Sequence, residues 1–386
     1  MRRVARWLVV TLLATPAPIE AQAVDHMAVA RRVLATTPLI DGHNDLPYAI
    51  YGSATAPGDV TAAAHDLRTR TPFHTDIARL RSGIVGGQFW SVYIPYGAVE
   101  EGAAKRQLEQ IDIALQLIER YPDVLGLALD ASDVERVFAS GRIASLLGME
   151  GGHAIENSLG ALRAYYALGV RYMTLTHNGT LDWADAGSDE HRHGGLTEFG
   201  KEVVREMNRL GMLVDLAHTS PETMNDALDV SEAPVIWSHA GARGVTEHTR
   251  NVPDQVLRRL PDNGGVVMVV FYPPFISTRG EATLSDVADH IDHVASLAGV
   301  DHVGIGSDFD GIGEVPRGLE DVSTFPVLFA ELSRRGWSES DLGKLAGENV
   351  LRVMREAEAV ARRLQRERPP STRTIDELDG PQGGAR

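Results

Sequence analysis

The sequence predicts a single α/β domain of the (β/α)8 class, the TIM barrel, and three observations support this fold. Eight apolar segments of strand length alternate with segments of helical character. A His, Asp or Glu follows most of these apolar runs. The 386 residues contain no solenoid repeat and no linker that would divide them. An open doubly wound sheet is the weaker alternative, because no glycine-rich phosphate turn follows the first strand.

The first 23 residues are typical of a secretory signal peptide. A start with three arginines precedes the short apolar run 7–14, and Ala-Gln-Ala at 21–23 is a small-residue cleavage site. The apolar run is too short to cross a bilayer, which favours cleavage near Ala23 over a retained anchor. We therefore expect a secreted or periplasmic protein without a stable membrane anchor. Its folded domain should cover 24–365, followed by an extended tail over 366–386.

The strands are expected where apolar runs end in a polar residue or a turn. They cover 39–45, 84–94, 143–150, 170–177, 212–218, 235–239, 265–272 and 303–308. The helices are expected where apolar residues recur with a helical period or where a capping residue precedes them. They cover 24–36, 77–82, 101–121, 131–140, 159–168, 197–210, a segment from Ser220, 253–260, 284–297, 324–335 and 338–365. Loops are expected over 48–71 and 178–195, which show no clear period.

The composition excludes several classes of function. A formal net charge of −16 and the absence of a basic block argue against nucleic-acid binding. The chain has no cysteine, so it forms no disulfide and offers neither a thiolate ligand nor a Cys nucleophile. Any metal must therefore be held by nitrogen and oxygen atoms.

The first predicted strand ends in His43 and Asp45, a pair suited to one metal ion. Side chains alternate between the two faces of a strand, so residues two apart point the same way. An imidazole nitrogen and a carboxylate oxygen can then converge on one point. Taken alone, the pair is explained equally well by a turn with a capping Asp. The residues at the ends of the other strands distinguish a metal site from such a turn.

Metal-ligating residue types also stand at the ends of five further strands. In a barrel all these ends meet at the C-terminal mouth, where this fold carries its chemistry. A single buried His is usually only hydrogen-bonded, but burying the whole set without a metal would leave several charges uncompensated. The set comprises His43, Asp45, Glu150, His177, His218, His239 and Asp308.

The arrangement of these residues predicts two metal ions. His43 pairs with Asp45, His218 pairs with His239, and Glu150 lies between the two pairs around the barrel. A carboxylate can bridge two ions about 3.5–4 Å apart. We therefore predict a binuclear centre with Glu150 as the bridge. Zinc is the expected metal for a His and carboxylate site, although Mn or Co could substitute.

Seven motifs follow one another between residues 35 and 363. They are Asp41-Gly42-His43-Asn44-Asp45-Leu46-Pro47, Gly148-Met149-Glu150-Gly151-Gly152-His153, Leu175-Thr176-His177-Asn178, Asp215-Leu216-Ala217-His218, Ser238-His239, Arg250-Asn251-Val252-Pro253 and Gly306-Ser307-Asp308-Phe309-Asp310-Gly311. In kind and order they resemble the membrane (renal) dipeptidase family, a branch of the metal-dependent amidohydrolase barrels. Cysteines and a lipid-anchor signal of human-type members are absent here, so membrane attachment is not implied.

The resemblance implies a role for each site residue and a homodimer. One zinc would be bound by His43 and Asp45 and the other by His218 and His239, with Glu150 shared. The substrate would be surrounded by His177, Arg250, Tyr272 and Asp308. Asp41, His153 and Asp310 are expected to support these groups.

These roles agree with the chemistry of peptide hydrolysis. Two zinc ions lower the pKa of a shared water, which attacks the peptide carbonyl next to Glu150. His177 can donate to the developing oxyanion, and Arg250 can bind a terminal carboxylate with two hydrogen bonds. Asp308 either accepts the proton of the water or holds the substrate ammonium group.

The expected function is that of a binuclear zinc dipeptidase acting on dipeptides with free N- and C-termini. The family tolerates a D-residue at the C-terminal position, so L,D-dipeptides are expected substrates. One alternative is an amidohydrolase of the same fold that acts on another amide, a lactone or a β-lactam. A second is a barrel that binds without turnover, against which the complete set of ligands argues.

Overall fold

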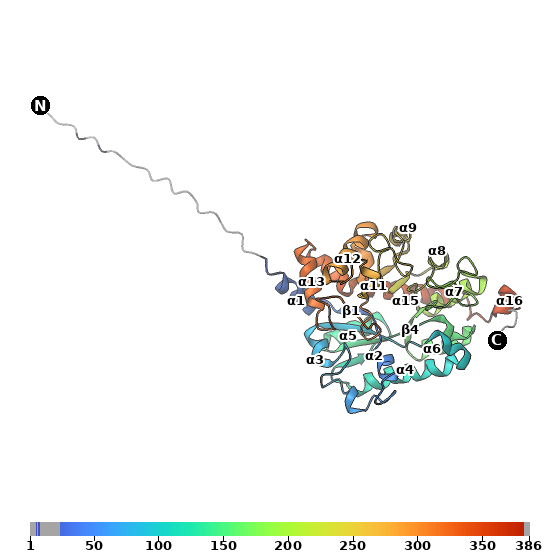
Figure 1. The fold of residues 1–386 in the computed structure, drawn as a ribbon. Coiled ribbons are helices and arrows are strands. Elements are labelled where there is room, and N and C mark those ends of the chain that lie inside the picture. The colour runs from blue at the N-terminus through green and yellow to red at the C-terminus, as the bar shows by residue number, and fades with distance from the viewer. Residues whose placement is uncertain (1–4, 6, 8–23, 382–386) are drawn as a thin grey trace.

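The computed structural model describes residues 5, 7 and 24–381, and in this part of the chain eight parallel strands close into a barrel (Figure 1). Hydrogen-bonded neighbours follow the order β2-β1-β9-β8-β7-β6-β5-β4, and a pairing of β2 with β4 closes the ring. The strands are β1 (Leu39–Asn44), β2 (Val85–Ser91), β4 (Ile143–Glu150), β5 (Val170–Thr174), β6 (Leu213–Asp215), β7 (Ile236–Ala240), β8 (Val266–Val269) and β9 (Val303–Ile305). The predicted barrel is confirmed, whereas the predicted signal peptide lies outside the described residues, apart from positions 5 and 7.

A ninth strand lies outside the barrel closure and was not expected from the sequence. β3 (Leu125–Leu127) pairs with the first half of β4, with Gly126 opposite Ala144. Its three residues are too few to show a period in the sequence. β3 is therefore stabilised by its hydrogen bonds to β4 and not by a pattern in its own sequence.

Several strands end earlier than predicted, because the chain leaves regular strand pairing as it approaches the barrel mouth. The expected strand 212–218 is regular only over Leu213–Asp215, and 265–272 only over Val266–Val269. His218 and Asp308, which follow β6 and β9, both have a φ of 67°. This left-handed backbone is strained for residues with a Cβ and turns both side chains out of the sheet pattern.

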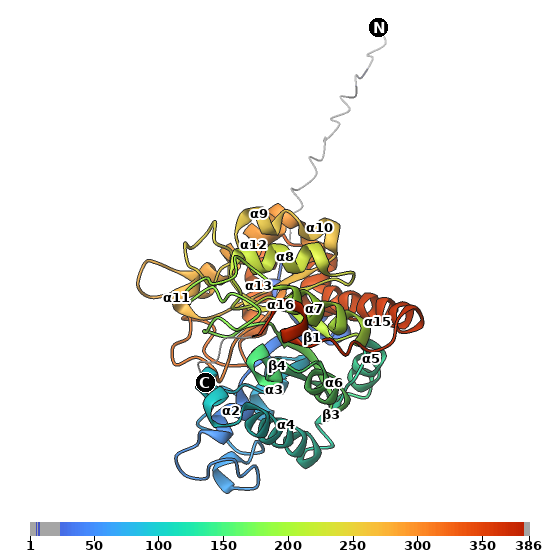
Figure 2. The same cartoon turned by 90° about the vertical axis from the view of Figure 1, so that its right-hand side faces the viewer.

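Helices surround the barrel on all sides (Figure 2). They are α1 (His26–Thr36), α2 (Leu46–Tyr51), α3 (Ile77–Ser82), α4 (Ala103–Arg120), α5 (Ala131–Ala139), α6 (Leu159–Ala167), α7 (Glu198–Leu210), α8 (Pro221–Val230), α9 (Asp254–Leu257), α10 (Leu260–Asn263), α11 (Pro273–Ile276), α12 (Leu284–Ala298), α13 (Phe325–Arg334), α14 (Glu339–Gly343), α15 (Asn349–Glu367) and α16 (Ile375–Asp379). The expected helix 253–260 is two short helices, α9 and α10. Among the residues described, no helix is long and apolar enough to cross a membrane.

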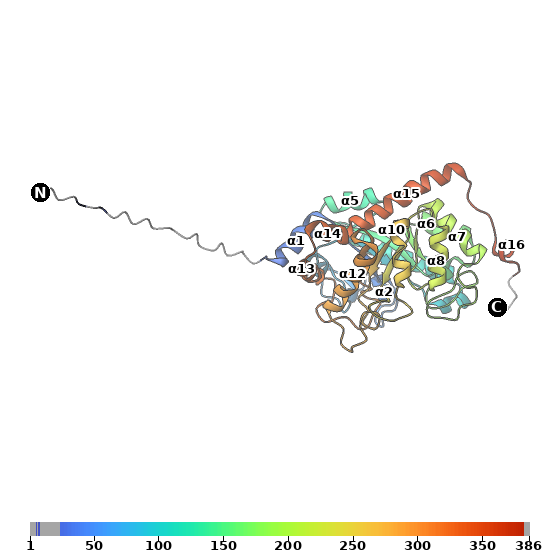
Figure 3. The same cartoon turned by 90° about the horizontal axis from the view of Figure 1, so that it is seen from above.

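The long helix predicted over 338–365 is interrupted by a π-helical turn at Lys344–Glu348, between α14 and α15. At Gly347 a Cβ atom would lie 2.2 Å from the carbonyl oxygen of Pro38. The wider turn and the glycine therefore let this segment approach the start of β1. Beyond the turn, α15 runs beside α5 (Figure 3), where Glu358 accepts a hydrogen bond from the Ala131 amide at 2.9 Å.

The C-terminal segment was expected to be extended, but its described part contains the short helix α16. Asp379 at the end of α16 accepts a hydrogen bond from the Thr197 hydroxyl at 2.7 Å. Thr197 is the residue that caps α7, so the tail is attached to the start of that helix. The segment is also held by Ser371, whose carbonyl accepts from Arg163 at 2.8 Å and whose amide donates to Glu206 at 3.3 Å.

Two buried aspartates hold neighbouring strand ends together below the mouth. Asp41 on β1 accepts hydrogen bonds from the amide and the hydroxyl of Ser307, both at 2.7 Å. Asp215 on β6 accepts from the Ser238 amide at 2.8 Å and from the Ser238 hydroxyl at 2.6 Å. Since Ser307 precedes Asp308 and Ser238 precedes His239, these contacts set the positions of both site residues.

Candidate metal centre and substrate cavity

The structure brings all seven predicted strand-end residues together at the C-terminal mouth. A cavity of about 420 Å³ opens there, with His43 fully buried beneath it. The other six line the cavity together with Arg250 and Tyr272, which lie beyond the ends of β7 and β8. The cavity-lining members of the predicted set are Asp45, Glu150, His177, His218, His239 and Asp308.

Glu150, the last residue of β4, lies between two groups of candidate ligands. One of its oxygens, Oε2, lies 3.5 Å from His43 Nε2, which is itself 3.2 Å from Asp45 Oδ2. The other oxygen, Oε1, lies 2.9 Å from His218 Nε2 and 3.5 Å from His239 Nε2. Each carboxylate oxygen therefore faces a different group, as a bridging ligand requires.

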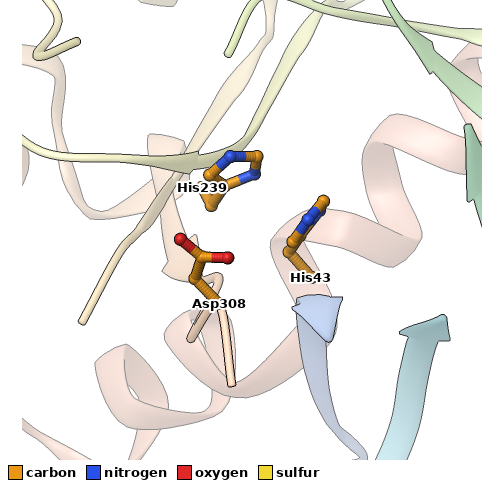
Figure 4. Close-up of side chains that lie close together, drawn as sticks. All are labelled: His43, His239 and Asp308. Carbon is orange, nitrogen blue, oxygen red and sulfur yellow. The ribbon is translucent and has the colours of Figure 1, made fainter. Parts of the chain in front are cut away.

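Asp308 belongs to a third group of candidate ligands, which the sequence did not predict. Ligand atoms of His43, His239 and Asp308 lie within 4.8 Å of one another. Figure 4 shows these three side chains converging from three different segments of the chain. Asp308 thus lies close to one histidine of each predicted pair.

The hydrogen bonds of the histidines indicate that their Nε2 atoms are the ligand atoms. His218 Nδ1 lies 3.1 Å from Asn178 Oδ1, and His239 Nδ1 lies 2.9 Å from the Ser238 hydroxyl oxygen, whose proton goes to Asp215. Both Nδ1 atoms must therefore donate, which leaves a lone pair on each Nε2. These two Nε2 atoms are only 3.0 Å apart. Two lone pairs at this distance repel unless positive charge lies beside them, and the Arg250 guanidinium supplies part of it, with Nη2 3.1 Å from His239 Nε2.

Two further buried atoms support a metal-binding role. His43 Nε2 and Asp45 Oδ1 have no hydrogen-bond partner, although both are buried. Buried polar atoms are normally paired, so such exceptions need an explanation. The residues present therefore fit a pair of divalent cations held by nitrogen and oxygen.

Burial controls the ionisation of the acidic and basic groups at the mouth. It raises the pKa of Glu150 and raises that of Asp308 well above its usual range. It lowers the pKa of His218 and His239 well below the usual value, so both rings are neutral, as metal ligands must be. The carboxylates beside neutral His218 and His239 form a site that favours added positive charge.

His177 lies beside the candidate metal groups and faces the cavity. Its Nε2 is 3.6 Å from Glu150 Oε1, and its ring centroid is 4.2 Å from that of His218. Burial, with a smaller contribution from the Arg250 charge, lowers the pKa of His177 to about 3. The ring is therefore a neutral hydrogen-bond donor or acceptor at physiological pH.

Arg250 provides a buried positive charge at the other side of the cavity. Its Nη2 lies 3.1 Å from His239 Nε2, and its Nη1 has no partner. Burial lowers its pKa to about 10, so the guanidinium remains charged at neutral pH. The guanidinium carbon lies 5.2 Å from the centre of the Phe275 ring, which packs on Tyr272.

Several cavity residues were not identified from the sequence. They are Tyr48, Tyr93, Ser188, His248, Phe275, Ile312 and Gly313, whereas Asn178, Asp310 and Gly311 belong to the motifs quoted above. Tyr93 lies two residues beyond the end of β2 but inside the predicted strand 84–94, so the sequence did not mark it as a residue of the mouth. By contrast, the expected supporting residues bind backbone: Asp310 accepts from the His74 amide at 2.6 Å, and His153 Nε2 lies 3.1 Å from the Ile94 carbonyl.

A parallel barrel whose C-terminal mouth gathers histidines and carboxylates in this way is the arrangement of the metal-dependent hydrolases. Within that class, the chain belongs to the family described as "Membrane dipeptidase (Peptidase family M19)", whose profile matches residues 27–368. It is thus a dipeptidase of a metallopeptidase family, a hydrolase acting on peptide bonds.

Known proteins similar to this chain agree with the family. Dipeptidase verJ of Clonostachys rogersoniana is 48% identical over 353 residues, which cover 88% of this chain and 89% of the relative. A metallo peptidase from Rhodobacter sphaeroides, liganded with a phosphinate mimic of L-Ala-D-Ala, has a TM-score of 0.75 and 27% identity, covering 83% of this chain and 99% of that one. The probable dipeptidase PvdM from Pseudomonas aeruginosa has a TM-score of 0.78 and 24% identity over 87% of this chain and 99% of that one, and supports the fold.

Proposed function

We propose that the chain is a binuclear zinc dipeptidase in which His43 and Asp45 hold one ion, His218 and His239 hold the other, and Glu150 bridges them. The observation that carries this proposal is the position of Glu150, whose two oxygens face two different histidine groups. When bound, the ions would polarise the scissile carbonyl and lower the pKa of a water.

The remaining cavity residues suit the two ends and the centre of a dipeptide. Arg250, buried and charged, would bind the terminal carboxylate with its unpartnered Nη1 and with Nη2. Neutral His177 would donate a hydrogen bond to the carbonyl oxygen as negative charge develops on it. Asp308, whose pKa is raised by burial, would accept the proton that the attacking water loses.

A D-residue at the C-terminal position of the substrate is part of the proposal. The Rhodobacter sphaeroides structure contains a phosphinate mimic of L-Ala-D-Ala, and that protein is 27% identical to this chain. The cavity of about 420 Å³ has room for a dipeptide side chain on the wall formed by Tyr272 and Phe275. We therefore propose that L,L- and L,D-dipeptides are both hydrolysed.

The test of this function is metal removal followed by metal addition. Chelation of the purified protein should abolish dipeptide hydrolysis, and two equivalents of Zn²⁺ should restore it. An L,L- and an L,D-dipeptide are compared as substrates, and bound metal is counted by elemental analysis. Full hydrolysis by the metal-free protein would refute the proposal. Two bound equivalents without turnover of either dipeptide would favour the alternative, an amidohydrolase acting on another amide, a lactone or a β-lactam.

Substitution of Arg250 separates the dipeptidase from this alternative. R250A should raise KM for a dipeptide about 100-fold, since a charge-assisted bidentate pair is lost, while a neutral lactone or an amide-capped dipeptide should be affected far less. Steady-state kinetics on both substrates measure the difference. R317A removes an exposed arginine outside the cavity and is the control. An equal loss on both kinds of substrate would argue against a carboxylate-binding role.

We further propose export of the chain with cleavage near Ala23, and association into a homodimer as the family resemblance implies. The first follows from the arginine-rich start, the apolar run and the small residues at 21–23. The mass of the protein recovered from an expressing cell, with its N-terminal sequence, tests the cleavage. Light scattering of the same material tests the dimer.

A further inference from the structure

Tyr172 reaches through the barrel interior from β5 to the underside of the metal centre. It is fully buried, and its hydroxyl oxygen lies 2.8 Å from His43 Nδ1 on β1. The ring passes over Gly148 of β4, where a Cβ atom would lie only 2.0 Å from Tyr172 Cζ. The missing side chain at position 148 is therefore what makes room for the tyrosine.

The hydrogen bonds of Tyr172 determine which nitrogen of His43 carries the proton. A phenol has one O–H to donate, and the Gly42 carbonyl oxygen accepts it at 3.1 Å. The phenolic oxygen is then an acceptor toward His43, so Nδ1 must donate. This leaves a lone pair on His43 Nε2, which lies 3.2 Å from Asp45 Oδ2 and 3.5 Å from Glu150 Oε2 and has no hydrogen-bond partner.

The two other histidines of the centre are oriented by different groups. His218 depends on Asn178, and His239 depends on the Ser238 hydroxyl, which is connected to Asp215. Neither contact involves Tyr172. Partners on the second ring nitrogen usually change metal affinity by about 10- to 100-fold when they are removed. The metal affinities of the two positions can therefore be lowered independently of each other.

On the basis of the two-metal centre proposed above, we propose that Tyr172 is a positioning residue that selectively sets the metal affinity of the His43 and Asp45 position. It does so by holding the His43 ring with Nε2 directed at the metal. The proposed role belongs to the hydroxyl group alone, because a phenylalanine ring at position 172 would pack in the same space.

The test is a Zn²⁺ titration of metal-free Y172F in competition with a chromophoric chelator. Wild-type protein should bind two equivalents, and Y172F should bind one of them with unchanged affinity and the other about 10- to 100-fold more weakly. Y121F is the matched control, because Tyr121 is equally buried and its hydroxyl contacts the Leu67 amide and Asp66, away from the metal centre. Thermal unfolding of the three metal-free proteins shows whether Y172F folds as Y121F does.

Crossed variants assign the weakened position. In a D45N background, which disables the His43 position, adding Y172F should leave the affinity of the remaining metal unchanged, whereas adding S238A should lower it. Wild-type affinities for both equivalents in Y172F would overturn the inference. So would an equal weakening of both equivalents, which indicates a general structural role. If the wild-type chain binds a single equivalent, the two-metal proposal fails; the positioning role then stands if Y172F weakens that equivalent, and falls if it does not.

Discussion

Replacing Glu150 by Gln is expected to remove both metal equivalents and to lower kcat/KM for a dipeptide at least about 1,000-fold, the equivalent of several kcal/mol of transition-state stabilisation. The substitution keeps the shape of the side chain and removes its charge. Since Oε1 lies 2.9 Å from His218 Nε2 and Oε2 lies 3.5 Å from His43 Nε2, one change affects both groups. Elemental analysis and steady-state kinetics measure the outcome, with E198Q as the control, since the Glu198 side chain at the start of α7 is exposed.

The stability of metal-free E150Q separates lost metal binding from misfolding. Burial raises the pKa of Glu150 above its unfolded value, so the folded state favours the protonated form. The stability contributed by this group is present below the unfolded pKa and is lost as pH rises through the folded pKa. A glutamine side chain at position 150 does not ionise, so metal-free E150Q does not lose stability in this way. It should be at least as stable as metal-free wild type at neutral pH. An E150Q protein that keeps two metals and full activity would contradict the bridging role.

The fold, and the meeting of most candidate ligands at one mouth, could be predicted from the sequence, because both depend on local patterns that the barrel repeats. A buried strand followed by a turn places its next polar residue at the mouth, whichever strand it is. His43, Glu150 and His239 were found in this way, each at the end of an apolar run. Because the C-terminal ends of all barrel strands meet at one mouth, these three residues were expected to lie close together.

Other features depend on contacts between distant segments and could not be predicted. In the described part of the chain β3 pairs only along β4, and the place of α16 depends on Asp379 meeting the cap of α7, although the capping box of Thr374 and Glu377 was a local signal for that helix. The position of Asp308 within reach of both His43 and His239 depends on a φ of 67°, which no pattern in the sequence signals. Tyr172 looks like an ordinary core residue of a strand, since its role depends on the gap at Gly148.

Replacing Asp308 by Asn is expected to lower kcat about 100- to 10,000-fold, the usual contribution of a positioned proton acceptor, while KM for a dipeptide stays close to the wild-type value. The expectation follows from its place beside His43 and His239 rather than at the edge of the cavity. Burial raises its pKa well above the usual range, and a carboxylate of higher pKa is a better base. Kinetics of D308N at saturating Zn²⁺, with metal content checked, measure the effect.

The competing role of Asp308, binding of the substrate ammonium group, predicts a different pattern. D308N would then raise KM for a free dipeptide and have little effect on an N-acetylated one, whereas a lost proton acceptor lowers kcat on both. D301N is the matched control, since Asp301 is exposed, pairs with Lys344 and lies outside the cavity. A KM effect confined to free dipeptides would therefore assign Asp308 to the ammonium group and require another residue to take the proton.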